Sequence, residues 1–404
     1  MRTWKIMLLI VIAFVGCKKP YDPPAIASPA SYLVVEGVIN AGNDSTIIKL
    51  SRTVNLSSKV ATNPLSGASI SVISDQNSSY PLTETKAGTY MSPGLNLNNA
   101  RTYRLNITTP DGKIYQSDFV TVLNSPPIDT IGYTVTKSDS SHGIQIFSGT
   151  HDPTNKAKYF RYDYQETWIF HSLYDSNYKS NGDTVLARDL VNDEIYKCWR
   201  SDTSSNIVLT SSAKLTQSVI SNNPITFISY DSEKIGDEYS ILVKQYALTS
   251  DAYKFWTNLK KNTEQLGSIF DALPSQINGN IHSITNPTEP VIGYISVGSV
   301  STKRVFISTR ELPAWLPALP NLNDDCIPVA CLYSFVNSFG SPPVNQVDEE
   351  INYLKGGGKY ALIPINAIVA LGTGVVLGYQ AADPICVDCT LRGTNKRPSF
   401  WVDK

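Results

Sequence analysis

Histidine is scarce in this chain of 404 residues, and neither sign of charge is in excess. The four histidines, His142, His151, His171 and His282, include no pair at the i, i+4 spacing of a helical metal site. Lysine and arginine total 34 against 35 acidic residues, and no basic block stands out. Binding to nucleic acid depends on a clustered positive surface, so a nucleic-acid partner is not expected. Nothing in the sequence indicates a cofactor.

Charged residues make up only 17% of the chain, whereas tyrosine occurs 22 times and serine, threonine and asparagine are abundant. Hydroxyl-rich and aromatic sequences of this kind favour strands. The length is sufficient for two domains, or three, with a sizeable core. We therefore expect a mainly β protein.

The apolar run at the N-terminus is too short to cross a membrane. It covers residues 7–15, about half of the ~20 residues that a spanning helix needs. It follows Arg2 and Lys5 and ends at Gly16 and Cys17, as in a secretory signal. A cysteine at this place resembles the lipobox of bacterial lipoproteins, which implies cleavage after Gly16 and a diacylglycerol on the Cys17 sulfur. We predict a lipoprotein signal peptide over residues 1–17; the alternative is a single membrane-anchoring helix.

A proline-rich segment follows, and it cannot pack as a helix. We predict a tether over residues 18–30 and a first domain over residues 31–123. Short alternating segments in this domain are separated by turn residues, for example at 33–39, 46–50, 68–73 and 103–109. Their number and spacing predict an immunoglobulin-like or transthyretin-like β-sandwich.

A second, larger β-rich domain is predicted over residues 127–404, after the boundary at Asn124-Ser125-Pro126-Pro127. Its strand at residues 159–170 places Tyr162, Tyr164, Glu166 and Trp168 on one face. A carboxylate among aromatic side chains is an unusual arrangement. One interpretation is a ligand groove read by Glu166; the other is that Glu166 pairs with a nearby arginine.

Two further segments of this domain have clear signatures. Residues 249–266 form the one amphipathic helix that the pattern predicts, with Ala252, Phe255, Trp256 and Leu259 on its apolar face and Thr249 or Ser250 as its cap. Residues 361–378 are apolar but interrupted by proline and glycine. They predict strands joined by a glycine bend, not a membrane span.

Five cysteines remain besides Cys17. Cys326, Cys331, Cys386 and Cys389 form two closely spaced pairs, and Cys198 is left over. Export to an oxidising compartment favours two disulfides among the four, with the pairing open. A four-thiolate metal site is the alternative for the same residues. Cys198 is expected to be buried among apolar side chains.

No serine–histidine–aspartate set, nucleophile elbow or phosphate loop occurs. Paired carboxylates of a glycan or peptide hydrolase could come only from Glu166, Asp163 and Asp152, a weak set. The sequence names no catalytic residue. An enzyme therefore remains an alternative and not the main hypothesis.

Several motifs resemble a family of Bacteroidota lipoproteins known as domain of unknown function 4249. They are residues 33–37 (LVVEG), 159–168 (YFRYDYQETW), 267–281 and the C-terminal stretch 386–401 with its two cysteines. Members resemble accessory lipoproteins encoded beside TonB-dependent outer-membrane receptors. The resemblance brings no established catalytic residues.

The family resemblance and the predicted lipid together suggest a non-catalytic binding lipoprotein. It would be anchored in the outer membrane and would partner a TonB-dependent receptor in nutrient uptake. Lys18 and Lys19 stand where many surface-exposed lipoproteins of this phylum carry acidic residues. The sequence therefore leaves open whether the chain faces the periplasm or the cell surface. A metal-handling lipoprotein that uses the clustered cysteines is a further alternative.

Overall fold

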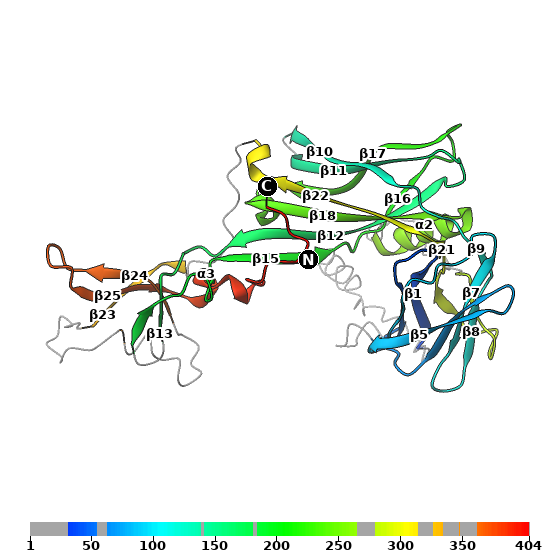
Figure 1. Cartoon of the computed structure of the whole chain (residues 1–404), viewed down its shortest axis with the longest axis horizontal. Helices are drawn as coiled ribbons and strands as arrows, with labels where there is room; N and C mark the ends of the chain where they lie inside the picture. Colours follow the sequence, from blue (N-terminus) through cyan, green and yellow to red (C-terminus); the bar gives the residue numbers. More distant parts are fainter. Residues whose placement is uncertain are drawn as a thin grey trace, which may run out of the picture.

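The computed structural model describes residues 31–54, 63–138, 141–180, 184–264, 279–313, 326–333, 347 and 362–403. The predicted signal peptide, Cys17 and the tether lie outside these residues. The described chain is mainly β, as its composition predicts. Its strands form three parts that lie in a row, with the N-terminal strands at one end and a narrow projection at the other (Figure 1).

The N-terminal strands belong to a twelve-stranded sheet, which we call the first sheet. Its order is β19-β8-β7-β4-β5-β6-β2-β1-β20, with β3, β9 and β21 beside this path. Strand β5 pairs with β4 on one side and β6 on the other, so the sheet curls without a break around one core. In β7, alternate residues Tyr103, Leu105 and Ile107 are buried, because period two places them on the same face. The nine N-terminal strands are β1 (Leu33–Asn40), β2 (Thr46–Arg52), β3 (Asn63–Pro64), β4 (Ser69–Ser74), β5 (Ser79–Lys86), β6 (Thr89–Ser92), β7 (Thr102–Thr108), β8 (Ile114–Ser117) and β9 (Val120–Thr121).

Three strands of the first sheet come from beyond residue 127. They are β19 (Ile281–Ser283), β20 (Val291–Gly293) and β21 (Val297–Gly298), which pair with β8 and β1. A Cβ at Gly293, where φ is +148°, would lie 2.3 Å from the Val35 carbonyl oxygen, so this close approach requires glycine. The buried side chain of Asn280 donates to the Ile295 carbonyl at 2.9 Å and accepts from the Ile295 amide at 2.8 Å. The sheet therefore includes strands from both sides of the boundary that the sequence places at residues 123–127.

Two sheets face each other in the middle of the molecule. One has the order β10-β11-β17, and the other has the order β15-β12-β18-β22 with β16 beside β12. Apolar side chains of both sheets, such as Ile144, Ile146, Phe160 and Ile241, form the core between them. The strands are β10 (Ile128–Ser138), β11 (Ser141–Asp152), β12 (Tyr159–His171), β15 (Lys197–Thr203), β16 (Val208–Ser211), β17 (Ser218–Ser229), β18 (Glu238–Leu248) and β22 (Val300–Ser308); the short 3-10 helices η1 (Glu233–Ile235) and η2 (Thr309–Glu311) adjoin them.

The predicted amphipathic helix is α2 (Ser250–Glu264). Thr249 is its cap, because its hydroxyl oxygen accepts a hydrogen bond from the Ala252 amide at 3.2 Å. Ala252 and Phe255 are buried as expected. No helix in the described ranges is long and apolar enough to cross a membrane.

The narrow projection, which we call the distal region, contains short strands and two small apolar clusters. Its main sheet has the order β23-β25-β24, and β13 pairs with β14. Gly372 and Gly374 have φ angles of +81° and +70° in the turn between β24 and β25, which confirms the predicted glycine bend. The elements are β13 (Tyr178–Ser180), β14 (Val185–Ala187), β23 (Val329–Leu332), β24 (Ile363–Val369), β25 (Val376–Ala382), α3 (Pro384–Val387) and η6 (Cys389–Leu391).

Candidate functional site

The aromatic face of β12 is part of the central core and not a groove. Tyr162, Tyr164, Glu166 and Trp168 do share a face, but each is at most 8% exposed. The sheet β10-β11-β17 covers this face, and burial raises the pKa of Tyr162. The ligand-groove interpretation of these four residues is therefore wrong: period two identifies residues on a shared face but not which face another sheet covers.

Glu166 has partners within this core. Its carboxylate accepts hydrogen bonds from Lys234 Nζ at 2.5 Å and from the Tyr239 hydroxyl at 2.8 Å. Burial, and then the neighbouring Glu166 carboxylate, raise the pKa of Tyr239. The pairing alternative is correct in kind, although the cation is a lysine and not an arginine. Both carboxylate oxygens are engaged, which is the usual condition for a buried charge.

The opposite face of β12 borders a pocket of about 950 Å³. The pocket lies where α2, the β12-β18-β22 sheet and the first sheet meet, and it is lined by residues from all three. The aromatic and charged lining residues are Glu36, Asp44, Lys49, Arg161, Asp163, Lys244, Tyr246, Phe255, Trp256 and Tyr294, and Leu259 of α2 is among the apolar ones. A cleft of this size with aromatic walls and a few polar groups is typical of a site for a small molecule or a short polymer segment.

Arg161 is at the centre of one wall of the pocket. Its guanidinium donates to Asp163 at 3.0 Å and lies 4.5 Å from the centre of the Tyr246 ring and 4.1 Å from that of Trp256. A guanidinium that lies over two aromatic rings and also donates a hydrogen bond to a carboxylate is fixed in position. Burial, and then Asp163, raise the pKa of Tyr246. This wall is therefore preorganised, with the Arg161 charge balanced by Asp163.

The three carboxylates of the hydrolase alternative do not converge. Asp163 borders the pocket, whereas Glu166 lies on the covered face of the same strand. Asp152 is the last residue of β11, and its carboxylate accepts from the backbone amides of Thr154 and Ala157 in the following turn at 2.9 and 2.7 Å. A glycosidase needs two carboxyl groups on either side of one bond, which this arrangement does not provide.

Two disulfides are present among the described residues, and their pairing corrects the sequence prediction. They join Cys198 to Cys389 and Cys326 to Cys386. Cys331 takes part in neither bond; it lies in β23 and packs in a different apolar cluster from Cys326 and Cys386. Closeness in sequence grouped Cys331 with Cys326, but the fold separates their side chains.

The four-thiolate metal site proposed for Cys326, Cys331, Cys386 and Cys389 is also corrected by this pairing. Three of these four sulfurs are in disulfide bonds and cannot act as thiolate ligands. In the part of the chain that the structure describes, no group of three or more histidine, cysteine or acidic residues is placed to hold a metal ion.

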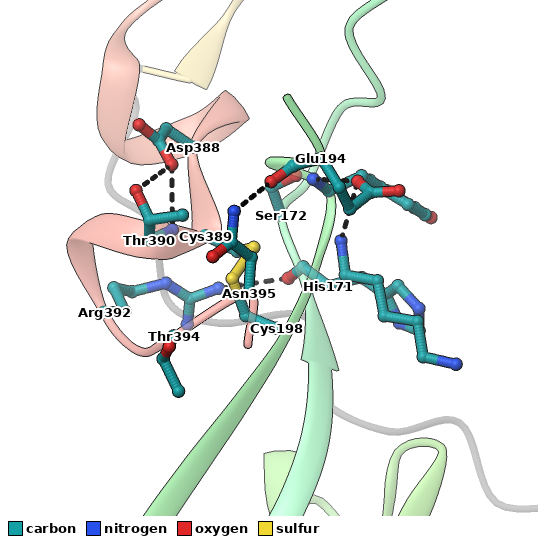
Figure 2. The surroundings of a disulfide bond; sticks show 12 residues. His171, Ser172, Glu194, Cys198, Asp388, Cys389, Thr390, Arg392, Thr394 and Asn395 are labelled. Atoms are coloured by element: carbon teal, nitrogen blue, oxygen red, sulfur yellow. Dashed lines mark hydrogen bonds between the residues drawn. A yellow bond between two sulfur atoms is a disulfide. The ribbon is translucent and has the colours of Figure 1, made fainter. Parts of the chain in front are cut away.

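Backbone pairing explains why Cys198 meets Cys389 (Figure 2). Trp199 and Thr394 exchange two backbone hydrogen bonds, of 2.8 and 2.9 Å, which hold the C-terminal segment along β15. The Arg392 guanidinium donates to the His171 carbonyl at 3.1 Å in the same place. The pairing partner of Cys198 was therefore set by a contact between segments almost 200 positions apart, for which the sequence gives no signal.

The comparison with protein families gives a match, and it covers the part of the chain that forms the pocket. The family model described as domain of unknown function (DUF4249) matches residues 18–304. This chain is a DUF4249 protein. The match contains β1, β12, β18 and α2 and the first part of β22, and thus every residue that lines the pocket, the last of which is Thr302. It ends before the C-terminal stretch 386–401, so the family assignment does not rest on that motif.

No curated protein matches this DUF4249 chain. Among solved structures it is similar to a DUF4785 family protein from Legionella pneumophila, with 10% identity over 52% of this chain and 51% of the other, and a TM-score of 0.17. It is also similar to the adhesin InvE of Yersinia pseudotuberculosis, with 14% identity over 54% and 55% of the two chains and a TM-score of 0.14. The chain thus spans about half the length of each of these structures.

Proposed function

We propose that this DUF4249 protein is a lipid-anchored, non-catalytic binding lipoprotein of the outer membrane of a member of the Bacteroidota, and that it partners a TonB-dependent receptor in the uptake of a nutrient. The pocket beside Arg161, Tyr246 and Trp256 is the observation that carries the binding role. The first domain would serve as an immunoglobulin-like or transthyretin-like module that positions the pocket. The curled first sheet with its single core supports that topology.

The composition of the pocket supports binding over catalysis. Its wall at Arg161 is neutral because Asp163 is the ion-pair partner, and its aromatic rings offer flat apolar surfaces. Groups that transfer protons in catalysis need access to substrate and a tuned pKa. The Tyr246 hydroxyl, with its pKa raised, stays protonated and can only donate or accept hydrogen bonds near neutral pH. Such a site recognises a cargo without transforming it.

Cys17 supports the location. A lipid on its sulfur, followed by a tether of residues 18–30, would hold the pocket at a short distance from the membrane. Two lysines directly after the cysteine would add only a weak attraction to anionic headgroups. The proposal therefore requires the lipid and not the lysines for anchoring.

Co-purification tests the receptor partnership. The chain, tagged at its C-terminus, is extracted from its own outer membrane with a mild detergent and purified, and its partners are identified by mass spectrometry. We expect a large outer-membrane receptor to accompany it. Cys17→Ser is the matched control, since it removes the acylated sulfur and should abolish both the anchoring and the recovery of the receptor. Recovery of the wild-type chain alone would contradict the partnership.

A pocket variant tests the binding role separately. Trp256→Ala removes one aromatic wall, and small molecules that co-purify with the wild-type chain should be lost from it. Phe227→Ala is the control, because Phe227 is an exposed aromatic residue of β17 outside the pocket. An unchanged set of bound molecules in Trp256→Ala would remove the pocket from the proposal.

A further inference from the structure

The hairpin β24–β25 ends in an exposed apolar tip. Val369, Leu371, Val375, Val376 and Leu377 are all exposed, and the Leu371 side chain is fully so at 101%. The hairpin forms the outermost part of the distal region, where β24 and β25 project away from the central sheets (Figure 1). Five exposed large apolar side chains around one hairpin tip form an apolar patch, and a contiguous patch of this kind indicates a binding surface.

The tip is apolar on both of its strands. Val369 of β24 is paired with Val376 of β25, Val375 and Leu377 flank Val376 where the register of the two strands shifts, and all four are exposed. No charged residue occurs between Lys359 and Asp383 in the sequence. A docking surface for a folded protein commonly has polar and charged groups around its apolar centre. A tip whose large exposed side chains are apolar in both strands and in the turn, with no charge near them in the sequence, instead fits a fluid apolar medium.

The backbone of the turn satisfies much of its own hydrogen bonding. The Ala370 amide donates to the Val375 carbonyl at 2.8 Å, and the Ala370 carbonyl accepts from the Thr373 and Gly374 amides at 3.4 and 3.3 Å. The Val375 amide donates to the Thr373 hydroxyl oxygen at 3.4 Å. Entry into a lipid bilayer is costly for unpaired backbone groups, and this pairing lowers that cost.

The base of the hairpin is fixed to the rest of the molecule. Cys386, four residues after the end of β25, is bonded to Cys326. The Ser176 hydroxyl donates to the Pro364 carbonyl at 2.8 Å at the start of β24, and the Tyr174 hydroxyl donates to the Cys326 carbonyl at 2.7 Å. Because its base is fixed by these bonds, the tip stays exposed and does not pack against the rest of the protein.

We propose that the β24–β25 tip inserts into the interfacial region of a lipid bilayer as a second membrane contact, in addition to any lipid on Cys17. The proposal uses neither the pocket nor a receptor. Because the tip carries no charge, insertion requires no anionic lipid and does not weaken with salt. Apolar side chains drive it, as they drive the binding of interfacial membrane segments.

Tryptophan quenching tests this insertion. The full chain carrying Leu371→Trp is reconstituted into phosphatidylcholine vesicles with and without brominated acyl chains, and no receptor is present. We expect brominated chains to remove most of the emission added by Trp at position 371. Val191→Trp is the matched control, because Val191 is also apolar and 86% exposed but has Asp189 and Asp193 beside it. Its added emission should not be quenched.

Equal quenching at positions 371 and 191, or none at 371, overturns the proposal. A second variant covers the case in which tryptophan itself draws the tip into lipid. Leu371→Asp should decrease the binding of vesicles by the unlipidated Cys17→Ser full chain by about tenfold or more, because one large apolar contact is replaced by a charge. Binding that is unchanged by Leu371→Asp would also overturn it. So would binding that disappears in 0.5 M salt, where the Debye length is about 4 Å and attraction between exposed charges is largely screened. Receptor recovery in the co-purification is read independently of both results.

Discussion

The first sheet and the distal region differ in how much apolar surface each encloses. The first sheet surrounds one cluster of 20 buried apolar residues, which come from strands throughout its length. The distal region has two clusters of five residues, and three of those ten residues are cysteines: Cys326 and Cys386 in one cluster and Cys331 in the other. Small cores give little stability by themselves and commonly depend on covalent links. The Cys326–Cys386 bond lies inside a distal cluster, and neither described disulfide lies in the first sheet.

Removal of the Cys326–Cys386 bond should cause the largest loss of stability, and the loss should be confined to the distal region. This bond joins residues 60 positions apart, and chain entropy gives such a link about 4 kcal/mol. In Cys326→Ala/Cys386→Ala we expect fast hydrogen exchange in β24 and β25 and unchanged exchange in β7. Cys331→Ala is the control, since Cys331 is buried in the other distal cluster but contributes to neither bond. Equal loss of protection in β7 would show that the first sheet depends on this disulfide as much as the distal region does.

Truncation of a core side chain in the first sheet should destabilise that sheet and leave the distal region unchanged. Leu105 is fully buried in β7, and Leu105→Ala is expected to lower the free energy of unfolding of the first sheet by about 3 kcal/mol. Hydrogen exchange in β7 should rise while that in β24 and β25 stays as in the wild type. Ile47→Ala serves as control, because Ile47 is an exposed apolar residue of β2. A comparable loss in Ile47→Ala would contradict the assignment of the stability to the core.

The sequence predicted local structure better than it predicted partners. Alternation identified β12, and the helical pattern identified α2 with its Thr249 cap. Both depend on neighbouring residues alone. The pocket residue Arg161 was missed, although it lies on β12 one position from the face chosen as the groove. Period two separates two faces, but only the packing of β10-β11-β17 decides which one is covered.

Contacts over long sequence distances account for the remaining differences. The strands β19, β20 and β21 return to a sheet that begins 250 residues earlier, roughly, and no local pattern encodes that return. The bond of Cys198 to Cys389 depends on the pairing of Trp199 with Thr394. The sequence left Cys198 over as a fifth cysteine beside the two close pairs, but nothing in it identified Cys389 as the partner. Trp256 gave a weak signal, because an aromatic stripe on a helix is more often core than pocket wall.

A single side chain, Asn280, tests whether the strands β19, β20 and β21 contribute to the stability of the first sheet. Asn280→Ala removes both hydrogen bonds to Ile295 and leaves a buried amide and carbonyl without them. We expect a loss of about 2 kcal/mol, measured as unfolding of the first sheet although the residue lies beyond position 127. Asn286→Ala is the control, since the Asn286 side chain accepts a hydrogen bond from the exposed Thr288 hydroxyl, and its backbone bond to Ser283 is kept in the variant. A loss confined to the central sheets would contradict the membership of these strands in the first sheet.

Alkaline titration gives the smallest expected effect and compares the two regions directly. Burial raises the pKa of Tyr115 in the first sheet to about 12, with a hydrogen bond to Glu289 as the next cause. Burial also raises the pKa of Tyr379 in the distal region to about 12, with Tyr333 as the next cause. Unfolded tyrosine has a pKa of about 10, so the unfolded chain loses these protons first as the pH rises. Each tyrosine therefore contributes stability that is complete below pH 10, roughly, and is lost between about pH 10 and 12.

Phenylalanine variants separate these two contributions. Tyr115→Phe should flatten the alkaline loss of the first sheet and also lower its stability slightly near neutral pH, because the 2.8 Å hydrogen bond to Glu289 disappears. Tyr379→Phe should flatten the alkaline loss of the distal region alone. Hydrogen exchange measured in β7 and β25 at several pH values reads both regions in one sample. If the distal region is held mainly by its disulfide, its alkaline loss in the wild type should be small beside that caused by reduction. An alkaline loss in β25 as large as that after reduction would instead show that the two small apolar clusters, and not the covalent bond, hold this region together.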